Sequence, residues 1–143
     1  MSAVFVYGTL LIPEILSIVL RRDVQQKDYR LATAKGFRRY ALPDRPYPVM
    51  RVSASDKTEG AVIVNVTDEE LKRLDHFEAE FYERRSIDVM TANGNMKAFA
   101  YIDPGTDRLE PIEWNRESFV QNYLTSYLQR AREWMIENGT YYC

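Results

Sequence analysis

The run Ala61-Val62-Ile63-Val64-Asn65-Val66 decides which fold this sequence predicts. All of its residues except Asn65 are apolar. A strand with one face in water alternates apolar and polar residues, whereas a nearly continuous apolar run is typical of a strand that is covered on both faces. The sequence therefore predicts a central strand over residues 58–66, with other parts of the chain packed on both of its sides.

A short helix is predicted directly after this strand. Thr67 and Glu70 have the spacing of a capping box, in which each side chain bonds the backbone N–H of the other residue. Leu71 and Leu74 give this helix one buried side, and we expect it to end near His76.

Before the central strand, the N-terminal residues predict a strand, a turn and a helix. Residues 4–7 form a short β-rich run that stops at Gly8. Pro13 occupies a position that is favoured at a helix start, and the apolar residues of 14–20 fall at helical spacing.

A further strand is predicted around Phe37 and Tyr40, within residues 32–42. Three prolines then predict an irregular loop over residues 43–48. Because proline cannot donate a hydrogen bond to a neighbouring strand, this loop cannot supply a central strand.

A hairpin is predicted after the short helix. Residues 82–90 and 96–102 flank Asn93-Gly94, and both of these turn residues tolerate positive φ. We expect two antiparallel strands, with the type of turn left open.

Residues 118–138 predict one long helix, which Gly139 is placed to stop. Its apolar residues recur every three or four positions, so its Tyr and Trp side chains are interpreted as packing against the sheet. The recurring residues are Phe119, Val120, Tyr123, Leu124, Tyr127, Leu128, Ala131, Trp134 and Met135.

Composition favours a single folded domain of the α+β class. With 143 residues, 45% of them apolar and 28% charged, the chain is long enough for one core and too short for two. We therefore expect one domain over residues 1–143, with strands and helices mixed along the chain. The net charge of -2, with both signs interleaved, gives no broad positive field, so nucleic acid is not expected as a partner.

Cysteine usage and hydropathy predict a cytoplasmic protein. Cys143 is the sole cysteine, so a disulfide within the chain is impossible and a reducing compartment fits. No basic leader begins the sequence, and no segment approaches the roughly 20 apolar residues of a membrane span. We expect a soluble, unprocessed protein that does not bind membranes, and the sequence leaves its oligomeric state open.

The first candidate site is the turn Tyr7-Gly8-Thr9-Leu10. A strand ends here and a helix follows, and Gly8 lets a ligand approach the backbone closely, so the free N–H groups could bind an anion. A tight turn with Tyr7 in the core would give the same pattern.

The second candidate is Glu78, which lies just past the predicted helix end and between Phe77 and Phe81. A carboxylate beside aromatic rings loses hydration, which raises its pKa toward the range that suits proton transfer near neutral pH. Many other charged residues surround it in the sequence, so a solvated surface glutamate is the alternative.

His76 is the only histidine, and its predicted place at a helix C-terminus explains it as a capping or surface group. With one histidine and one terminal cysteine, the sequence predicts no zinc or other metal site.

Several short motifs together resemble the γ-glutamylcyclotransferase-like superfamily, especially its AIG2-like, or γ-glutamylamine cyclotransferase, branch. The Tyr-Gly-Thr-Leu turn at residues 7–10 is followed about 70 residues later by the Leu-Asp-x-Phe-Glu block at residues 74–78, a more specific combination than either half. The order and spacing match over about residues 4–103. The motifs are Phe5-Val6-Tyr7-Gly8-Thr9-Leu10, Tyr47-Pro48, Glu59-Gly60-Ala61, Leu74-Asp75-x-Phe77-Glu78, Tyr82-x-Arg84 and Ala100-Tyr101-Ile102.

The resemblance implies a small mixed β-barrel flanked by helices and closed by the long C-terminal helix. It implies that Glu78 is the catalytic residue, and that residues 7–10 hold the γ-glutamyl end of a small-molecule substrate, with their backbone N–H groups on its α-carboxylate. Tyr82 and Tyr101 look like pocket-lining or orienting residues, and Arg84 like the partner of a nearby carboxylate.

The implied reaction releases 5-oxoproline and a free amine, without metal or cofactor. Relatives that act on glutathione typically show Tyr-Gly-Ser-Leu, which weighs mildly against that substrate here. Ala79 stands where many relatives have glycine, so a non-catalytic binding module on the same fold is the alternative to an enzyme. A Glu78 that faces a pocket and is screened from water would favour the enzyme. Whether residues 43–48 form a lid is left open.

Overall fold

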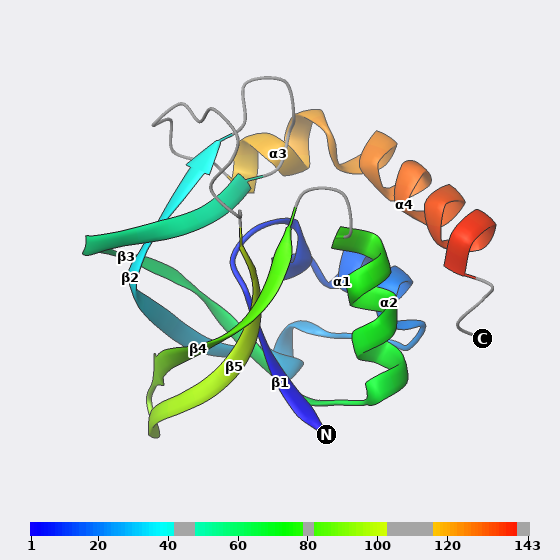
Figure 1. The fold of residues 1–143 in the computed structure, drawn as a ribbon. Coiled ribbons are helices and arrows are strands. Elements are labelled where there is room, and N and C mark those ends of the chain that lie inside the picture. Colours follow the sequence, from blue (N-terminus) through cyan, green and yellow to red (C-terminus); the bar gives the residue numbers. More distant parts are fainter. Residues whose placement is uncertain (42–47, 79–81, 103–115, 140–143) are drawn as a thin grey trace.

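The computed structural model describes residues 1–41, 48–78, 82–102 and 116–139 (Figure 1). These ranges contain strands and helices mixed along the chain, as the sequence predicted. Their order is β1 (Ser2–Val6), a 3-10 turn (Thr9–Leu11), α1 (Pro13–Leu20), a second 3-10 turn (Gln26–Asp28), β2 (Arg30–Ala41), β3 (Pro48–Val66), α2 (Asp68–Glu78), β4 (Glu83–Thr91), β5 (Gly94–Ile102), α3 (Arg116–Asn122) and α4 (Leu124–Gly139).

The five strands close into a small barrel in the order β1-β3-β2-β4-β5. Neighbouring strands are antiparallel except β1 and β5, which pair in parallel at Val4 and Phe99. β3 lies between β1 and β2, and residues on both sides of it pair with Ala61 and Val62. The predicted central position of this apolar run is therefore confirmed.

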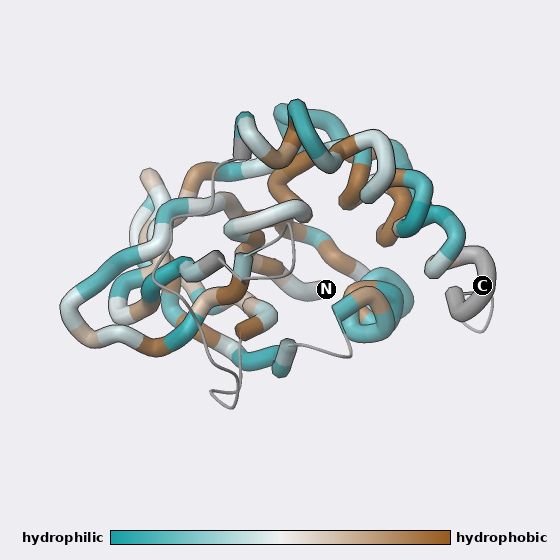
Figure 2. The backbone as a smooth tube through the Cα atoms, turned by 90° about the horizontal axis from the view of Figure 1, so that it is seen from above, coloured by the Kyte–Doolittle hydropathy of each residue, from teal (hydrophilic) through white to brown (hydrophobic). Residues whose placement is uncertain are grey.

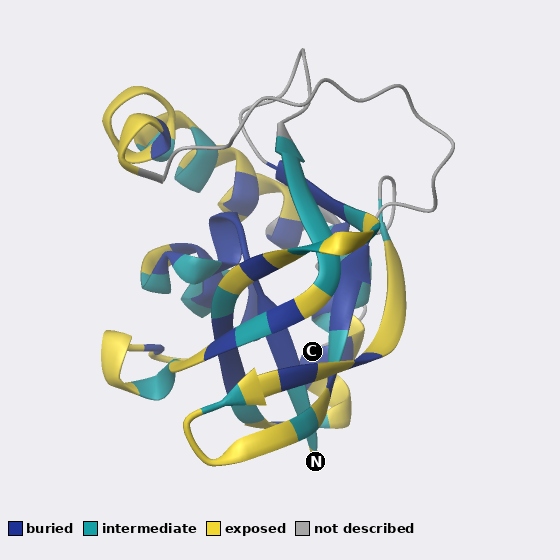
Figure 3. Ribbon diagram, turned by 90° about the vertical axis from the view of Figure 1, so that its left-hand side faces the viewer, coloured by how far each residue is buried: buried dark blue, intermediate teal, exposed yellow. Residues whose placement is uncertain are grey.

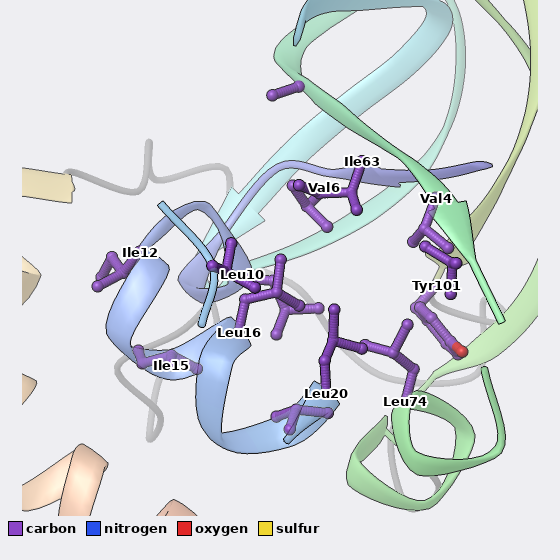
Figure 4. Packing of buried hydrophobic residues seen from close by; sticks show 14 of the residues in the cluster. Val4, Val6, Leu10, Ile12, Ile15, Leu16, Leu20, Ile63, Leu74 and Tyr101 are labelled. Carbon is purple, nitrogen blue, oxygen red and sulfur yellow. The ribbon is translucent and has the colours of Figure 1, made fainter. Parts of the chain in front are cut away.

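β1 is buried on both of its faces. Phe5 points into the barrel, where it packs in a cluster to which all five strands contribute. Val4 and Val6 point the other way and pack with residues of the helices such as Leu16 and Leu74 (Figure 4). This alternation follows from the period of two along a strand, and it explains why a strand of this barrel carries apolar residues at successive positions.

The helices lie against one side of the barrel, where α1 packs against both α2 and α4 (Figure 1). Hydrophobic positions recur along α3 and α4 between hydrophilic ones (Figure 2). Phe119 of α3 and Met135 of α4 are almost fully buried in the core that also contains α1 and α2. Buried residues thus run through the strands and through the helix faces that meet the barrel (Figure 3).

The start of β3 differs from the prediction. Pro48 was placed in a loop, but it is the first residue of β3 and pairs with Ala41 at the end of β2. A strand tolerates proline at its first position. The segment before residue 58 was missed because half of its residues are polar, and its pairing with β2 shifts register between Lys35 and Phe37. The rest of the predicted loop, residues 43–47, lies outside the described ranges.

The helix after β3 is longer than expected. Both hydrogen bonds of the predicted capping box are present, Thr67 N to Glu70 Oε1 at 3.0 Å and Glu70 N to Thr67 Oγ1 at 3.1 Å. The helix does not end near His76, however, but continues to Glu78. This correction matters because it gives Glu78 a helical register and directs its side chain.

The predicted hairpin is confirmed, and its loop is short. Thr91 pairs with Gly94, so only residues 92 and 93 lie between the strands. Gly94 has φ of +108°, while Asn93 is not among the residues with positive φ.

The predicted single C-terminal helix is two helices, α3 and α4, that meet at Tyr123. The helical hydrogen bonds continue through this point, from Tyr123 N to Phe119 O and from Tyr127 N to Tyr123 O, which explains why the periodicity does not reveal the break. Tyr127 packs on the core, whereas Tyr123 and Trp134 are 47% and 37% exposed and stack on the rings of Phe119 and His76, so these two side chains are packed only in part.

Gly60 provides a test of the close contact between β1 and β3. A Cβ at this position would lie 2.3 Å from Val6 O and 2.9 Å from Phe5 Cζ. Gly60→Ala is therefore expected to lower the free energy of unfolding by about 1–3 kcal/mol, measured by urea denaturation. The control is Glu59→Ala, because the Glu59 side chain is exposed on the same strand. Equal stability of the two variants would contradict the predicted clash.

Candidate functional site

One narrow pocket brings the predicted site residues together. Its cavity volume is about 30 Å³, so it admits only a slender group without movement of its walls. Its lining comes from the end of β1 and the turn after it, the start of β3, the end of α2, the residue before β4, and β5. The lining residues are Phe5, Val6, Tyr7, Gly8, Thr9, Leu10, Pro48, Glu78, Tyr82 and Tyr101.

Every residue that the sequence analysis singled out for the site lies in this lining, namely Tyr7, Gly8, Thr9, Leu10, Glu78, Tyr82 and Tyr101. No site role was predicted from the sequence for Phe5, Val6 or Pro48. All three lie within the motifs that carried the family resemblance, and that proximity in sequence was the available signal.

Glu78 contributes a buried carboxyl group to the pocket. It is the last residue of α2 and only 9% exposed. Loss of hydration raises the pKa of its carboxyl group from 4.5 to about 8, which confirms the direction expected from the sequence. The helix C-terminus carries partial negative charge and also disfavours the carboxylate. Within the described ranges, no side chain or backbone N–H donates a hydrogen bond to this carboxyl group.

Register along α2 explains why this side chain faces inward. Leu74, four residues before Glu78, is 1% exposed and lies in the hydrophobic core. Residues four positions apart lie on the same face of a helix. The apolar contact that docks α2 on the barrel therefore also carries Glu78 into the pocket.

The turn at residues 7–10 lies close against the ring of Pro48. A Cβ on Gly8 would lie 2.7 Å from Pro48 Cγ and 2.9 Å from its Cδ, so glycine is required by the space at this position. The first hydrogen bond of the 3-10 turn joins Leu11 N to Gly8 O at 2.9 Å. The N–H groups of Thr9 and Leu10 precede it and so have no partner within that turn.

The pocket tyrosines all donate their hydroxyl protons to the protein. Tyr7 Oη donates to Tyr101 O at 2.5 Å, and Tyr82 Oη donates to Pro48 O at 2.7 Å. Tyr101 Oη donates to Asp75 Oδ1 at 2.7 Å. Since a hydroxyl group has only one proton, each of these oxygens can act toward any further group only as an acceptor.

Asp75 links Tyr101 to a cation. Arg84 Nη1 lies 3.3 Å from Asp75 Oδ2, which confirms the expectation that Arg84 pairs with a nearby carboxylate. Burial raises the pKa of Tyr101, and the hydrogen bond and charge of Asp75, with the charge of Glu78, act in the same direction. Tyr101 therefore remains a neutral phenol in the pocket.

His76 lies outside the pocket lining. Its ring stacks on Trp134 with 5.3 Å between the ring centroids, and burial lowers its pKa. In the described part of the chain, no three His, Cys, Asp or Glu side chains are grouped as a metal site would require. Among the helices there, none is both long and apolar enough to cross a membrane. Ala79, which the sequence analysis flagged, is outside the described ranges.

Comparison with known proteins identifies relatives over most of the chain. Residues 4–121 match the family described as "Gamma-glutamyl cyclotransferase, AIG2-like". The chain is similar to AIG2-like protein D of Arabidopsis thaliana, with 30% identity over 141 residues that cover 96% of this chain and 91% of that protein.

Solved structures have a similar fold. A solution structure of a protein from Arabidopsis thaliana has 27% identity and a TM-score of 0.69, and the match covers 94% of this chain and 90% of that one. A structure named gamma-glutamyl cyclotransferase has a TM-score of 0.57 with 14% identity, over 92% of this chain and 86% of that one. At that identity, the second likeness concerns the fold alone.

The pKa of Glu78 predicts a pH dependence of stability. Because the folded pKa of about 8 is above the unfolded value of 4.5, protonation of Glu78 favours the folded state. The stabilisation of the folded state by protonated Glu78 is fully present below about pH 4.5 and is lost as the pH rises through about 8. Glu78→Gln lacks it, so the variant should gain stability relative to the wild type between pH 5 and pH 9, on the order of a few kcal/mol.

Urea denaturation at several pH values measures this difference. Glu69→Gln is the matched control, because Glu69 is exposed on the same helix. Its stability should follow that of the wild type at every pH. Parallel pH profiles for Glu78→Gln and the wild type would show that Glu78 is not desolvated in the folded protein.

Proposed function

Because this chain belongs to the AIG2-like family of γ-glutamyl cyclotransferases, we propose that it is an enzyme that cleaves a γ-glutamyl amide into 5-oxoproline and a free amine. The observation that carries the proposal is the buried carboxyl group of Glu78 in the lining of a pocket. The same observation favours an enzyme over a binding module, since a glutamate without a chemical role would be more stable in solvent.

The reaction is an attack of the substrate on itself. The α-amine nitrogen bonds to the γ-carbonyl carbon, which closes a five-membered lactam, and the bond from that carbon to the amide nitrogen breaks. Of the three protons on the α-ammonium, one stays on the lactam nitrogen and two end on the leaving amine. Since nucleophile and electrophile belong to one molecule, holding the bent conformation can supply several kcal/mol of the barrier reduction, and no covalent enzyme intermediate is needed.

Glu78 is proposed to move these protons. An ammonium cannot attack, so Glu78 takes a proton from it and returns a proton to the leaving nitrogen. Its pKa of about 8 is close to that of an ordinary α-amine, roughly 8, so transfer in either direction costs little free energy. A general acid-base group of this kind contributes about 10²- to 10⁴-fold to the rate.

The turn at residues 7–10 is proposed to bind the α-carboxylate. The N–H groups of Gly8, Thr9 and Leu10 are the donors in this proposal, and the hydroxyl oxygens of Tyr82 and Tyr101 complete the pocket as acceptors. The leaving amine then lies toward the pocket opening, so recognition is strict for the γ-glutamyl half and loose for the other half. No metal or cofactor takes part in this chemistry.

The setting proposed for this activity is the cytoplasm, with a small molecule as the partner and one domain as the active unit. The support is the single cysteine and the lack of a broad positive field in a chain of net charge -2.

Glu78→Gln tests the proposal directly. The variant keeps the shape of the side chain but cannot carry a proton between nitrogens, so release of 5-oxoproline should fall at least about 100-fold. The substrates are a panel of γ-glutamyl dipeptides, γ-glutamyl-ε-lysine and glutathione, with 5-oxoproline measured by chromatography.

Glu69→Gln serves as the control and should retain wild-type turnover, because it removes a similar charge from the exposed face of α2. Release by Glu78→Gln at the wild-type rate would remove Glu78 from the mechanism. No release by the wild type from any substrate of the panel would count against the proposed reaction and favour a binding module.

A further inference from the structure

Arg39 of β2 contacts the backbone of the pocket turn from outside the pocket. Its Nη1 donates a hydrogen bond to Tyr7 O at 2.9 Å, and the same atom is 3.4 Å from Glu59 O. Arg39 is not part of the pocket lining, whereas Tyr7 and Gly8 are. A cation that is distant in sequence therefore lies behind the turn that the proposed carboxylate site uses.

Because the peptide bond is planar, this contact also determines the direction of the Gly8 N–H. Tyr7 C=O and Gly8 N–H belong to one planar peptide unit, and the described ranges contain no cis peptide bond. In a trans peptide these two groups point in opposite directions. By holding the Tyr7 carbonyl, Arg39 therefore also fixes the direction of the N–H of Gly8, a residue that lines the pocket.

The charge of Arg39 also changes the strength of that N–H as a donor. A cation at the carbonyl oxygen draws electron density through the peptide unit, and hydrogen bonds in such a chain strengthen one another. On its other side Gly8 is confined by the ring of Pro48, 2.7 Å from where a Cβ would lie. The peptide unit is thus fixed from two directions with its donor presented to a ligand.

We infer that Arg39 is a positioning residue that orients and strengthens the Gly8 N–H, and so gives the pocket its preference for ligands that carry a carboxylate. This inference rests on the proposed function, in which the turn binds the α-carboxylate of the γ-glutamyl group. Arg39 acts through the peptide unit and does not touch the ligand.

Two small lactams test this role. 5-Oxoproline and 2-pyrrolidinone share the same five-membered ring and differ by one carboxylate. The dissociation constants of both are measured by calorimetry for the wild type, Arg39→Met and Arg39→Gln. We expect the wild type to prefer 5-oxoproline, and each variant to lose about 10-fold or more of that affinity while its affinity for 2-pyrrolidinone changes less than about 2-fold.

Arg38→Met is the matched control. Arg38 is the neighbouring residue of β2, and its guanidinium carbon lies 5.4 Å from the centre of the Tyr40 ring. Removing it deletes the same charge from the adjacent position of the strand, whose side chain points to the opposite face of the sheet, and leaves the bond to Tyr7 O intact. The ratio of the two affinities should therefore stay at the wild-type value, and a loss equal to that of Arg39→Met would overturn the inference in favour of a general charge effect.

Further outcomes separate the inference from the proposed function. An unchanged ratio in a folded Arg39 variant overturns the inference even if the wild type releases 5-oxoproline. If neither variant folds, Arg39 is a structural residue and the inference is overturned as well. A wild type that binds 5-oxoproline with an Arg39-dependent preference but releases none from γ-glutamyl amides supports the inference and counts against the proposed reaction alone.

Discussion

Burial of β1 on both faces is the constraint on which the pocket depends. Val4 and Val6 are held by the helices, and Phe5 is held by the interior of the barrel. A shift of the strand by one residue would exchange these faces, so its register is strongly specified. The end of β1 therefore fixes where the turn at residues 7–10 begins. The opposite wall of the pocket depends on a different pairing, because Pro48 lies at the start of β3, where it pairs with Ala41 of β2.

The pocket is an extension of the hydrophobic core that contains one ionisable carboxyl group. Leu74 docks α2 on the core, and Glu78 follows one turn later on the same face. The contact that stabilises the fold thereby removes water from the group that the proposed reaction needs. Tyr101 joins the two regions, since its ring packs with Leu74 in the core while its hydroxyl group is held by Asp75 (Figure 4). Stability and proton affinity are thus set by the same packing.

Long-range hydrogen bonds hold the carbonyl groups of the turn. Tyr29 Oη donates to Leu10 O at 2.6 Å, and Arg39 donates to Tyr7 O from β2. These donors lie far from the turn in the sequence, and they leave the N–H side of the same backbone for a ligand. A binding surface made of backbone N–H groups does not depend on which side chains the turn carries. Its affinity for a ligand depends instead on how rigidly these distant donors hold the backbone.

The sequence by itself determined the order of the elements, the central apolar run at residues 61–66, the capping box and the hairpin, because each depends on residues close together in the chain. Its motifs also named seven of the ten residues that line the pocket. Prediction from the sequence failed where a contact between residues far apart in the chain decided the local structure. Pro48 begins a strand because β2 lies beside it, and Glu78 is buried because it lies one turn after the core residue Leu74 on the same face of α2. The break at Tyr123 was hidden because the helical hydrogen bonds continue through it.

The raised pKa of Glu78 and the contact of Arg39 with Tyr7 were decided only by the tertiary structure, since desolvation and a hydrogen bond between residues far apart arise from packing, which no local pattern encodes.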